Sequence, residues 1–313
     1  PNDLPNAAGG RGRFVIVGAG KTGIDACLWL LRNHIKPERL TWIMPRDSWF
    51  LDRANIQPGA QFLDRFNASF AARQKAVHSA TSVAELFELL EANGCLLRLD
   101  PAVRPTMYRC ATVSQAELSQ LRRIESIVRM GRVERIESNE IVLTDGTIGA
   151  DDSALYIDCS TDGLERRPAL TVFDGERITL QSLRGCQQVF SASLIAHIEG
   201  AYNDDQTKNH LCAPVPHPNT DLDWLETTLA EQRNEIRWFE HPELMDWLGS
   251  SRLNLFRDTF APILENLEVR EHTLEMLTSV LRSSNGKLEE LRSTATLRRA
   301  SRSAVASRCR VQQ

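Results

Sequence analysis

The sequence predicts an α/β protein with a strand–helix–strand unit near its N-terminus and a mostly helical C-terminal region. Three observations carry this prediction. An apolar strand runs directly into a glycine-rich turn, an amphipathic helix leaves that turn, and a second apolar strand follows the helix. Beyond residue 187, by contrast, apolar residues recur mostly at helical spacing.

The glycine-rich turn is the most informative element of the chain. An apolar strand spans residues 13–17, and an amphipathic helix spans residues 24–32. Between them lies a Gly-x-Gly-x-x-Gly pattern, which consists of Gly18, Ala19, Gly20, Lys21, Thr22 and Gly23. In this strand–turn–helix context, the pattern is the fingerprint of a dinucleotide-binding βαβ unit.

Each glycine has an expected role. Gly18 lets the chain turn tightly, Gly20 lets a pyrophosphate approach the backbone, and Gly23 lets the helix pack close to the strand. Free N–H groups at the helix start would face the phosphates, helped by the helix dipole. We therefore expect a Rossmann-type domain in which all six turn residues bind the cofactor. The alternative is a glycine turn that only packs.

The end of the second strand indicates which dinucleotide is bound. An NAD site usually places an acid about 20 residues past the glycines, where it accepts from the ribose 2′-hydroxyl. Here the strand at residues 40–44 ends in Pro45-Arg46, and a guanidinium suits a 2′-phosphate. Asp47 follows directly, so NAD remains possible. The sequence favours NADP, with Arg46 on the 2′-phosphate; a solvated surface arginine is the alternative.

A helical insert and a loop are expected after this unit. The insert covers residues 49–100, and its clearest helix spans residues 83–90, where apolar residues recur at helical spacing. Asn93-Gly94 ends that helix. Residues 98–112 read as a loop because two prolines interrupt them.

A capped helix and a β-meander come next. Ser114 and Glu117 have capping-box spacing, which predicts a helix from Ser114 to about Ile124. Strands at residues 127–130, 133–136 and 140–144 form the meander, and Asp145-Gly146 supplies a turn. A buried strand at residues 154–158 then ends in a turn of small residues, Ser160-Thr161-Asp162-Gly163.

The remaining chain divides into a helical region and a tail. A hairpin is expected at residues 172–180, and helices at 187–199, at 221–239 and in the last stretch through 291. Residues 292–313 are rich in Arg and Ser, which predicts a basic disordered tail. The expected domains are therefore 1–164, which binds NAD(P), 165–291, which is mostly helical, and 292–313.

Composition excludes several classes of protein. The formal net charge is −4, and no run of about 18 apolar residues predicts a membrane helix. The cysteines number seven, are widely spread and never form Cys-x-x-Cys, so neither a disulfide framework nor a zinc site is expected. The ATP-binding loop that Gly20-Lys21-Thr22 suggests would need a glycine at Val15. We expect a cytoplasmic protein that binds a small-molecule substrate, with no nucleic-acid or membrane partner.

Together these features resemble the NAD(P)H-binding half of two-dinucleotide flavoproteins, especially the flavin-containing and Baeyer–Villiger-type monooxygenases. The resemblance covers residues 13–163 and rests on the glycine turn, the basic residue after the second strand, the meander and the motif around Thr161. In that family the chain leaves the NADPH domain through an Ala-Thr-Gly-like motif. Ser160-Thr161-Asp162-Gly163 stands at that place, one residue longer.

The resemblance implies a function and a second cofactor. It implies that NADPH passes a hydride to FAD, that the reduced flavin acts on oxygen or an organic substrate, and that Thr161 belongs to the cofactor site. The family holds FAD with a second, N-terminal glycine fingerprint, which these 313 residues do not contain. We therefore expect an FAD segment upstream of this sequence, with residues 165–313 completing the FAD domain or forming a cap.

Two other functions stay open from the sequence. One is a non-catalytic NAD(P)-binding module or redox sensor, and the other is a flavin-independent dehydrogenase whose substrate domain is the helical half. A polar group in the predicted loop, Arg104, Tyr108 and Arg109, could face nicotinamide, although a surface turn explains it as well. The spacing of His210, Cys212 and His217 lacks a second ligand pair, so no metal is expected. No catalytic residue and no oligomeric state is predicted.

Overall fold

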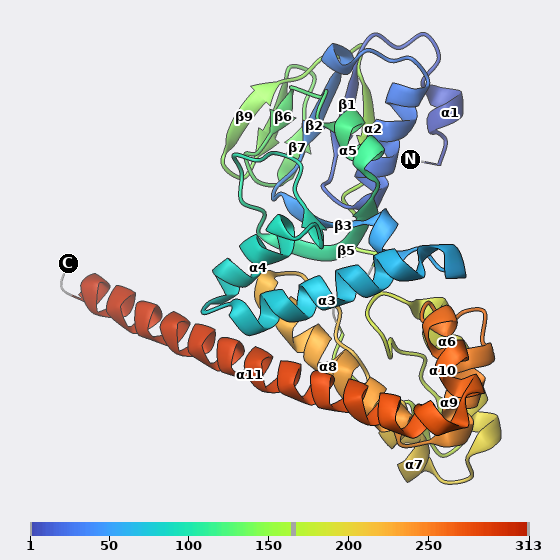
Figure 1. The fold of residues 1–313 in the computed structure, drawn as a ribbon. Coiled ribbons are helices and arrows are strands. Elements are labelled where there is room, and N and C mark those ends of the chain that lie inside the picture. Colours follow the sequence, from blue (N-terminus) through green and yellow to red (C-terminus); the bar gives the residue numbers. More distant parts are fainter. Residues whose placement is uncertain (1, 164–166, 312–313) are drawn as a thin grey trace. The chain divides into compact units, whose positions relative to one another are not determined.

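The computed structural model describes residues 2–163 and 167–311, and its contacts divide the chain into two compact units. The first unit comprises Pro1–Arg53 and Leu97–Glu165, and the second comprises Ala54–Leu96 and Arg166–Gln313. Figure 1 labels many of the elements of both units. Residues 54–96, expected as an insert in the first domain, group with the second unit by their contacts.

The first unit is an α/β structure built on a parallel sheet, as the sequence predicts. Its four strands lie in the order β10-β1-β2-β6, and every neighbouring pair is parallel. Because the strands are parallel, their carboxyl ends share one edge of the sheet. The strands are β1 (Phe14–Val17), β2 (Leu40–Ile43), β6 (Ile127–Val128) and β10 (Leu155–Asp158).

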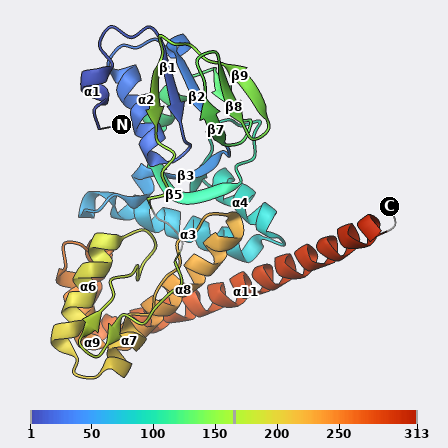
Figure 2. The same cartoon turned by 180° about the vertical axis from the view of Figure 1, so that it is seen from behind.

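The core of this unit lies between the parallel sheet and α2. Buried apolar residues recur at strand spacing in β1 and at helical spacing in α2. Helix α2 (Lys21–Arg32) turns Ile24 and Leu28 toward Phe14 and Ile16 of β1, and all four are almost fully buried. Figure 2 shows α2 beside these strands from behind. Three shorter helical segments complete this part: α1 (Leu4–Ala7), η1 (Pro37–Arg39) and α5 (Gln115–Leu121).

Two smaller sheets flank this arrangement. One has the order β4-β3-β5, and the other is the antiparallel meander β7-β8-β9. The predicted first strand of the meander, residues 127–130, instead pairs with β2 in the parallel sheet. The predicted turn at Asp145-Gly146 lies one residue earlier, at Thr144-Asp145, because Gly146 already pairs with Leu143. The prediction of a loop over residues 98–112 is wrong in its second half, because β5 pairs there with β3 in parallel. The strands are β3 (Ser48–Asp52), β4 (Leu96–Leu97), β5 (Met107–Val113), β7 (Val133–Ile136), β8 (Glu140–Leu143) and β9 (Gly146–Gly149).

The second unit is mostly helical, with one two-stranded hairpin. Its core includes Leu194, Trp238 and Met245, each at most 1% exposed. The hairpin consists of β11 (Phe173–Asp174) and β12 (Arg177–Ile178). The helical elements are η2 (Arg53–Ile56), η3 (Ala60–Phe62), α3 (Leu63–Ser79), α4 (Val83–Ala92), α6 (Gln188–Ala201), α7 (Asp205–Leu211), α8 (Asp221–Phe239), α9 (Pro242–Ser250), α10 (Arg257–Glu265) and α11 (Leu267–Val311).

The last helix differs from the expectation of a disordered tail at residues 292–313. Helix α11 runs on to Val311 because this stretch, though basic, is rich in good helix formers and contains neither Gly nor Pro. Among the described helices, none combines the length and the apolar composition that crossing a bilayer requires.

Candidate functional site

The residues predicted to bind a cofactor all follow carboxyl ends of the parallel sheet. The glycine turn follows β1, Arg46 follows β2 and Thr161 follows β10. Since the strand order is β10-β1-β2-β6, the turn lies between the other two positions. The crevice outside the carboxyl ends of parallel strands is where α/β proteins bind ligands.

Gly18 is required by the backbone of the fold. Its φ is +123°, and a Cβ there would lie 2.3 Å from the carbonyl oxygen of Cys159. Its amide donates to the carbonyl oxygen of Ile43 at 2.9 Å. The start of the turn is therefore fixed against the ends of both neighbouring strands, and a residue with a side chain would displace it.

Gly23 is required by the packing of helix against turn. A Cβ on Gly23 would lie 2.3 Å from the carbonyl oxygen of Gly18. The same oxygen accepts a hydrogen bond of 2.8 Å from the indole Nε1 of Trp42, a buried residue of β2. Helix α2 can approach the turn this closely only because Gly23 has no side chain.

Gly20 differs from both, because the fold does not require a glycine there. Its φ is −82° and its ψ is 179°, which any residue adopts. A Cβ on Gly20 would meet no atom within 4 Å. Gly20, the N-cap residue of α2, therefore leaves open the space that a side chain would fill.

The first backbone amides of α2 have no acceptor within the helix. Gly20 is the N-cap and provides no side-chain hydrogen bond, and the first intrahelical bond of the turn runs from the Ile24 amide to the Gly20 carbonyl. The amides of residues 21–23 precede that bond, so they have no acceptor within the helix. Lys21 and Thr22 are exposed, and the Lys21 ammonium pairs with Asp25 one turn on.

Arg46, which favours NADP, and Asp47, which would favour NAD, lie in different environments. Arg46 is half-buried, whereas Asp47 is only 5% exposed. Both carboxylate oxygens of Asp47 accept from Arg129, at 2.7 Å from Nε and 3.0 Å from Nη2. These hydrogen bonds raise the pKa of Arg129 above its ordinary value. Asp47 is thus already bound by a neighbouring cation.

Thr161 is exposed, in the segment where the chain leaves β10. Two residues earlier, the Cys159 amide donates to the Val17 carbonyl at 2.8 Å, so this exit lies directly beside the glycine turn. The next residue, Asp162, accepts from both terminal nitrogens of Arg109, at 2.7 Å and 3.0 Å. The segment around Thr161 is therefore held to β5.

The structure gives different surroundings to the members of the polar group Arg104, Tyr108 and Arg109. Tyr108 is 5% exposed, and the Arg104 guanidinium lies 5.9 Å from the ring centre of Trp49. Arg109 reaches the segment after β10 through Asp162. It lies in a bulge of β5 in which Cys110 has a φ of +55°, a conformation that non-glycine residues rarely adopt.

Sequence reasoning missed Trp42, Arg129 and the Arg109–Asp162 pair. Each contact joins residues that are 24 or more positions apart in the chain. No local pattern marks such partners. The strand order alone brings them together.

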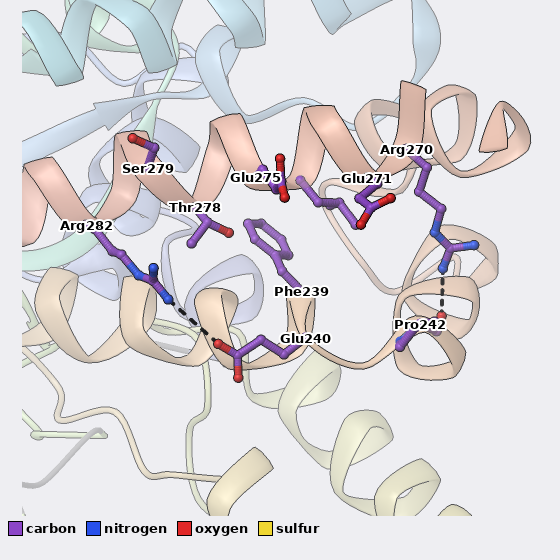
Figure 3. Close-up of a pocket in the computed structure, with 10 residues that line it drawn as sticks. Phe239, Glu240, Pro242, Arg270, Glu271, Glu275, Thr278, Ser279 and Arg282 are labelled. Carbon is purple, nitrogen blue, oxygen red and sulfur yellow. Dashed lines mark hydrogen bonds and ion pairs between the residues drawn. The ribbon is translucent and has the colours of Figure 1, made fainter. Parts of the chain in front are cut away.

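The helical unit carries a groove and a buried charge cluster. Figure 3 shows the groove, lined by the end of α8, the start of α9 and α11. Its arginines are paired: Arg270 donates to the Pro242 carbonyl at 2.9 Å, and Arg282 lies 3.8 Å from Glu240. Within the described residues no group of three potential ligands could hold a metal ion.

The charge cluster surrounds Arg184, which is 3% exposed. Its guanidinium lies 4.4 Å from the ring centre of Phe190 and donates to Asn254 at 2.7 Å. Glu231 and Glu235 of α8 are its nearby acids. Burial, together with the neighbouring Glu235 charge, raises the pKa of Glu231 to about 7. Because Arg184 is buried and contacts both Phe190 and Asn254, we assign it a structural role.

The comparisons with known proteins give relatives without an assigned function. An uncharacterized protein from Mycobacterium bovis and an uncharacterized protein from Mycobacterium tuberculosis are each 54% identical to this chain over 296 residues. The match covers 95% of this chain and 55% of each relative, so the chain spans about half the length of the curated relatives it matches. No family model and no solved structure matches.

Proposed function

We propose that this chain binds NADP(H) at the turn Gly18–Gly23, with Arg46 on the 2′-phosphate, and forms the NADP(H)-binding part of a flavin-dependent oxidoreductase. One observation carries the nucleotide site: Gly20 is a glycine where neither backbone conformation nor packing requires one. A turn that only packs needs Gly18 and Gly23 and nothing more. A ligand that lies on the backbone needs Gly20 too.

The helix cap supports the same proposal. Ser, Asp and Asn stabilise a helix N-terminus better than Gly, because their side chains accept from the first amides. With Gly20 as N-cap, those amides remain available to an external anion. The charge and dipole of the helix start favour a pyrophosphate at that place.

The positions of these residues along the edge of the sheet support the following arrangement of the cofactor. The pyrophosphate would lie at the turn, the adenosine ribose beyond β2 beside Arg46, and the nicotinamide toward Thr161 after β10. Bound nicotinamide supplies the hydride, and the protein binds and orients it. The flavin and the small-molecule substrate rest on the resemblance to the two-dinucleotide flavoproteins, and we assign no catalytic acid or base.

The nucleotide site is tested by calorimetric titration of the chain with NADPH and with NADH. Arg46→Ala is expected to weaken NADPH binding about tenfold or more, since charge-assisted bonds to the 2′-phosphate are lost, and to leave NADH binding unchanged. The matched control is Arg123→Ala, an exposed arginine that precedes β6 at the opposite edge of the sheet. Absence of binding by either nucleotide, or equal loss of both in Arg46→Ala, would contradict the proposal.

The flavin is tested on the longer mycobacterial relative rather than on this chain. The purified relative is expected to carry FAD, seen as the visible absorbance of oxidised flavin, which NADPH bleaches without oxygen. A colourless protein that neither binds added FAD nor reduces it with NADPH would limit the function to nucleotide binding.

A further inference from the structure

We propose that Arg129 sets the preference of this chain for NADP(H) over NAD(H), by holding Asp47 away from the ribose. This inference rests on the proposed function, because it concerns the same nucleotide site. It addresses what the sequence leaves open: an acid follows Arg46 directly, near the position from which acids in NAD sites accept the ribose 2′-hydroxyl.

An unpaired carboxylate at this position would oppose NADP(H) binding. Its charge would repel the 2′-phosphate and compete with the phosphate for Arg46, and its oxygens would accept from the 2′-hydroxyl of NAD(H). The structure removes both effects. The Asp47 side chain is 3% exposed, and its two oxygens accept from two different nitrogens of Arg129.

The register of the sheet places Arg129 where it can do this. Strand β6 lies beside β2, and the Met44 amide donates to the Val128 carbonyl at 3.0 Å. The residues that follow these two strands, Asp47 and Arg129 among them, therefore lie at the same edge of the sheet. Arg129 also lies 3.4 Å from Asp100, a second acid on its terminal nitrogen.

The backbone of Asp47 is fixed as well. Its carbonyl oxygen accepts from the amides of Thr106 and Met107, both at 3.1 Å, at the start of β5. The main chain of Asp47 is thus tied to one sheet and its side chain to the end of another strand. Arg46, one residue earlier, is half-buried and is the residue that the proposed function assigns to the 2′-phosphate.

The test is a mutant cycle in which NADPH and NADH are titrated against four proteins: wild type, Arg129→Gln, Asp47→Asn and the double variant. In Arg129→Gln the Asp47 charge has lost its main partner, so the dissociation constant for NADPH should rise about tenfold or more, while that for NADH stays the same or falls. In the double variant the charge is gone, and NADPH affinity should return to within about threefold of wild type.

A purely structural role of Arg129 predicts a different pattern. Arg129→Gln would then weaken both nucleotides by the same factor, and Asp47→Asn would not rescue it; that result overturns the inference. Asp47→Asn alone covers the case in which Arg129→Gln does not fold, as judged by circular dichroism. NADH affinity should be unchanged in Asp47→Asn, and a tenfold loss would show that Asp47 already contacts the ribose and would overturn the inference.

The two proposals fail in distinguishable ways. If wild type binds neither nucleotide, the nucleotide site itself is wrong, and the role of Arg129 falls with it. If wild type binds NADPH and loses it in Arg46→Ala, but the ratio of the two affinities is the same in Arg129→Gln as in wild type, only the inference on Arg129 is refuted.

Discussion

The indole Nε1 of Trp42 donates a 2.8 Å hydrogen bond to the carbonyl oxygen of Gly18. Trp42 belongs to β2, and Gly18 also donates its own amide to Ile43 of the same strand at 2.9 Å. The second strand therefore holds the first glycine of the turn from two sides. A Cβ added to Gly23 would lie 2.3 Å from that same carbonyl oxygen, so the Trp42 hydrogen bond holds the atom against which the start of α2 packs.

Replacing Trp42 by Phe keeps an aromatic ring in the core and removes the donor. The Gly18 carbonyl then loses its buried partner, which costs about 1–3 kcal/mol of unfolding free energy. Nucleotide affinity should fall several-fold, because the turn is less constrained. Denaturant unfolding and NADPH titration measure the two effects, with Trp29→Phe in α2 as the control. Unchanged stability in Trp42→Phe would show that the hydrogen bond does not constrain the turn.

Glu117 stabilises the first unit through three partners. It accepts from the Ser114 amide at 2.9 Å, which completes the predicted capping box, and from Arg53 at 3.1 Å and Arg32 at 3.0 Å. Burial acts to raise the pKa of Glu117, but these partners outweigh it and lower the pKa to about 2.

Because that pKa is lowered, the stabilisation is present above the ordinary pKa of 4.5 and is lost as the pH falls toward 2. Glu117→Gln should therefore lower the unfolding free energy at pH 7 by about 2 kcal/mol, and should reduce the loss of stability between pH 4.5 and pH 2. The exposed Glu134→Gln serves as the control. A variant that is as stable at pH 7 as wild type would refute this role.

Glu231 in the second unit should give the opposite dependence on pH. Its pKa is raised from 4.5 to about 7 by burial and by Glu235, while the positive charges of Arg73 and Arg184 act to lower it. A raised carboxyl pKa gives stability that is present below pH 4.5 and is lost as the pH rises toward 7.

The melting temperature of Glu231→Gln, measured relative to wild type, should therefore rise between pH 5 and pH 8. The difference between the two proteins isolates Glu231 from other groups that titrate in this range. Glu226→Gln, an exposed position on the same helix, is the control and should show no such trend. A constant difference between Glu231→Gln and wild type would mean that Glu231 stays ionised throughout.

The sequence predicts those parts of the fold that local patterns encode. The strand, turn and helix around Gly18 and the capping box at Ser114 depend on residues that are close in the chain, and both are present in the structure. Strand β5 was missed because a bulge at Cys110 interrupts its alternation. Asp47 and Arg129 lie 82 positions apart, and only the order of the strands brings them together.

Two substitutions in the glycine turn separate packing from ligand binding. Gly23→Ala places a Cβ 2.3 Å from a backbone oxygen, so it should destabilise the protein by about 1–3 kcal/mol as well as weaken nucleotide binding. Gly20→Ser, by contrast, should not destabilise the protein. Serine is a better N-cap, its Cβ meets open space, and the unfolding free energy should stay the same or rise by a few tenths of a kcal/mol.

NADPH binding by Gly20→Ser is the most direct measurement of the central claim. The serine side chain would fill the open space at Gly20, and its hydroxyl oxygen would accept a hydrogen bond from an amide at the start of α2. A correctly folded, equally or more stable variant whose NADPH dissociation constant is raised about tenfold or more is the predicted result. If wild type binds NADPH and Gly20→Ser binds it with the same affinity, no pyrophosphate lies on this turn, and the glycine fingerprint serves packing alone.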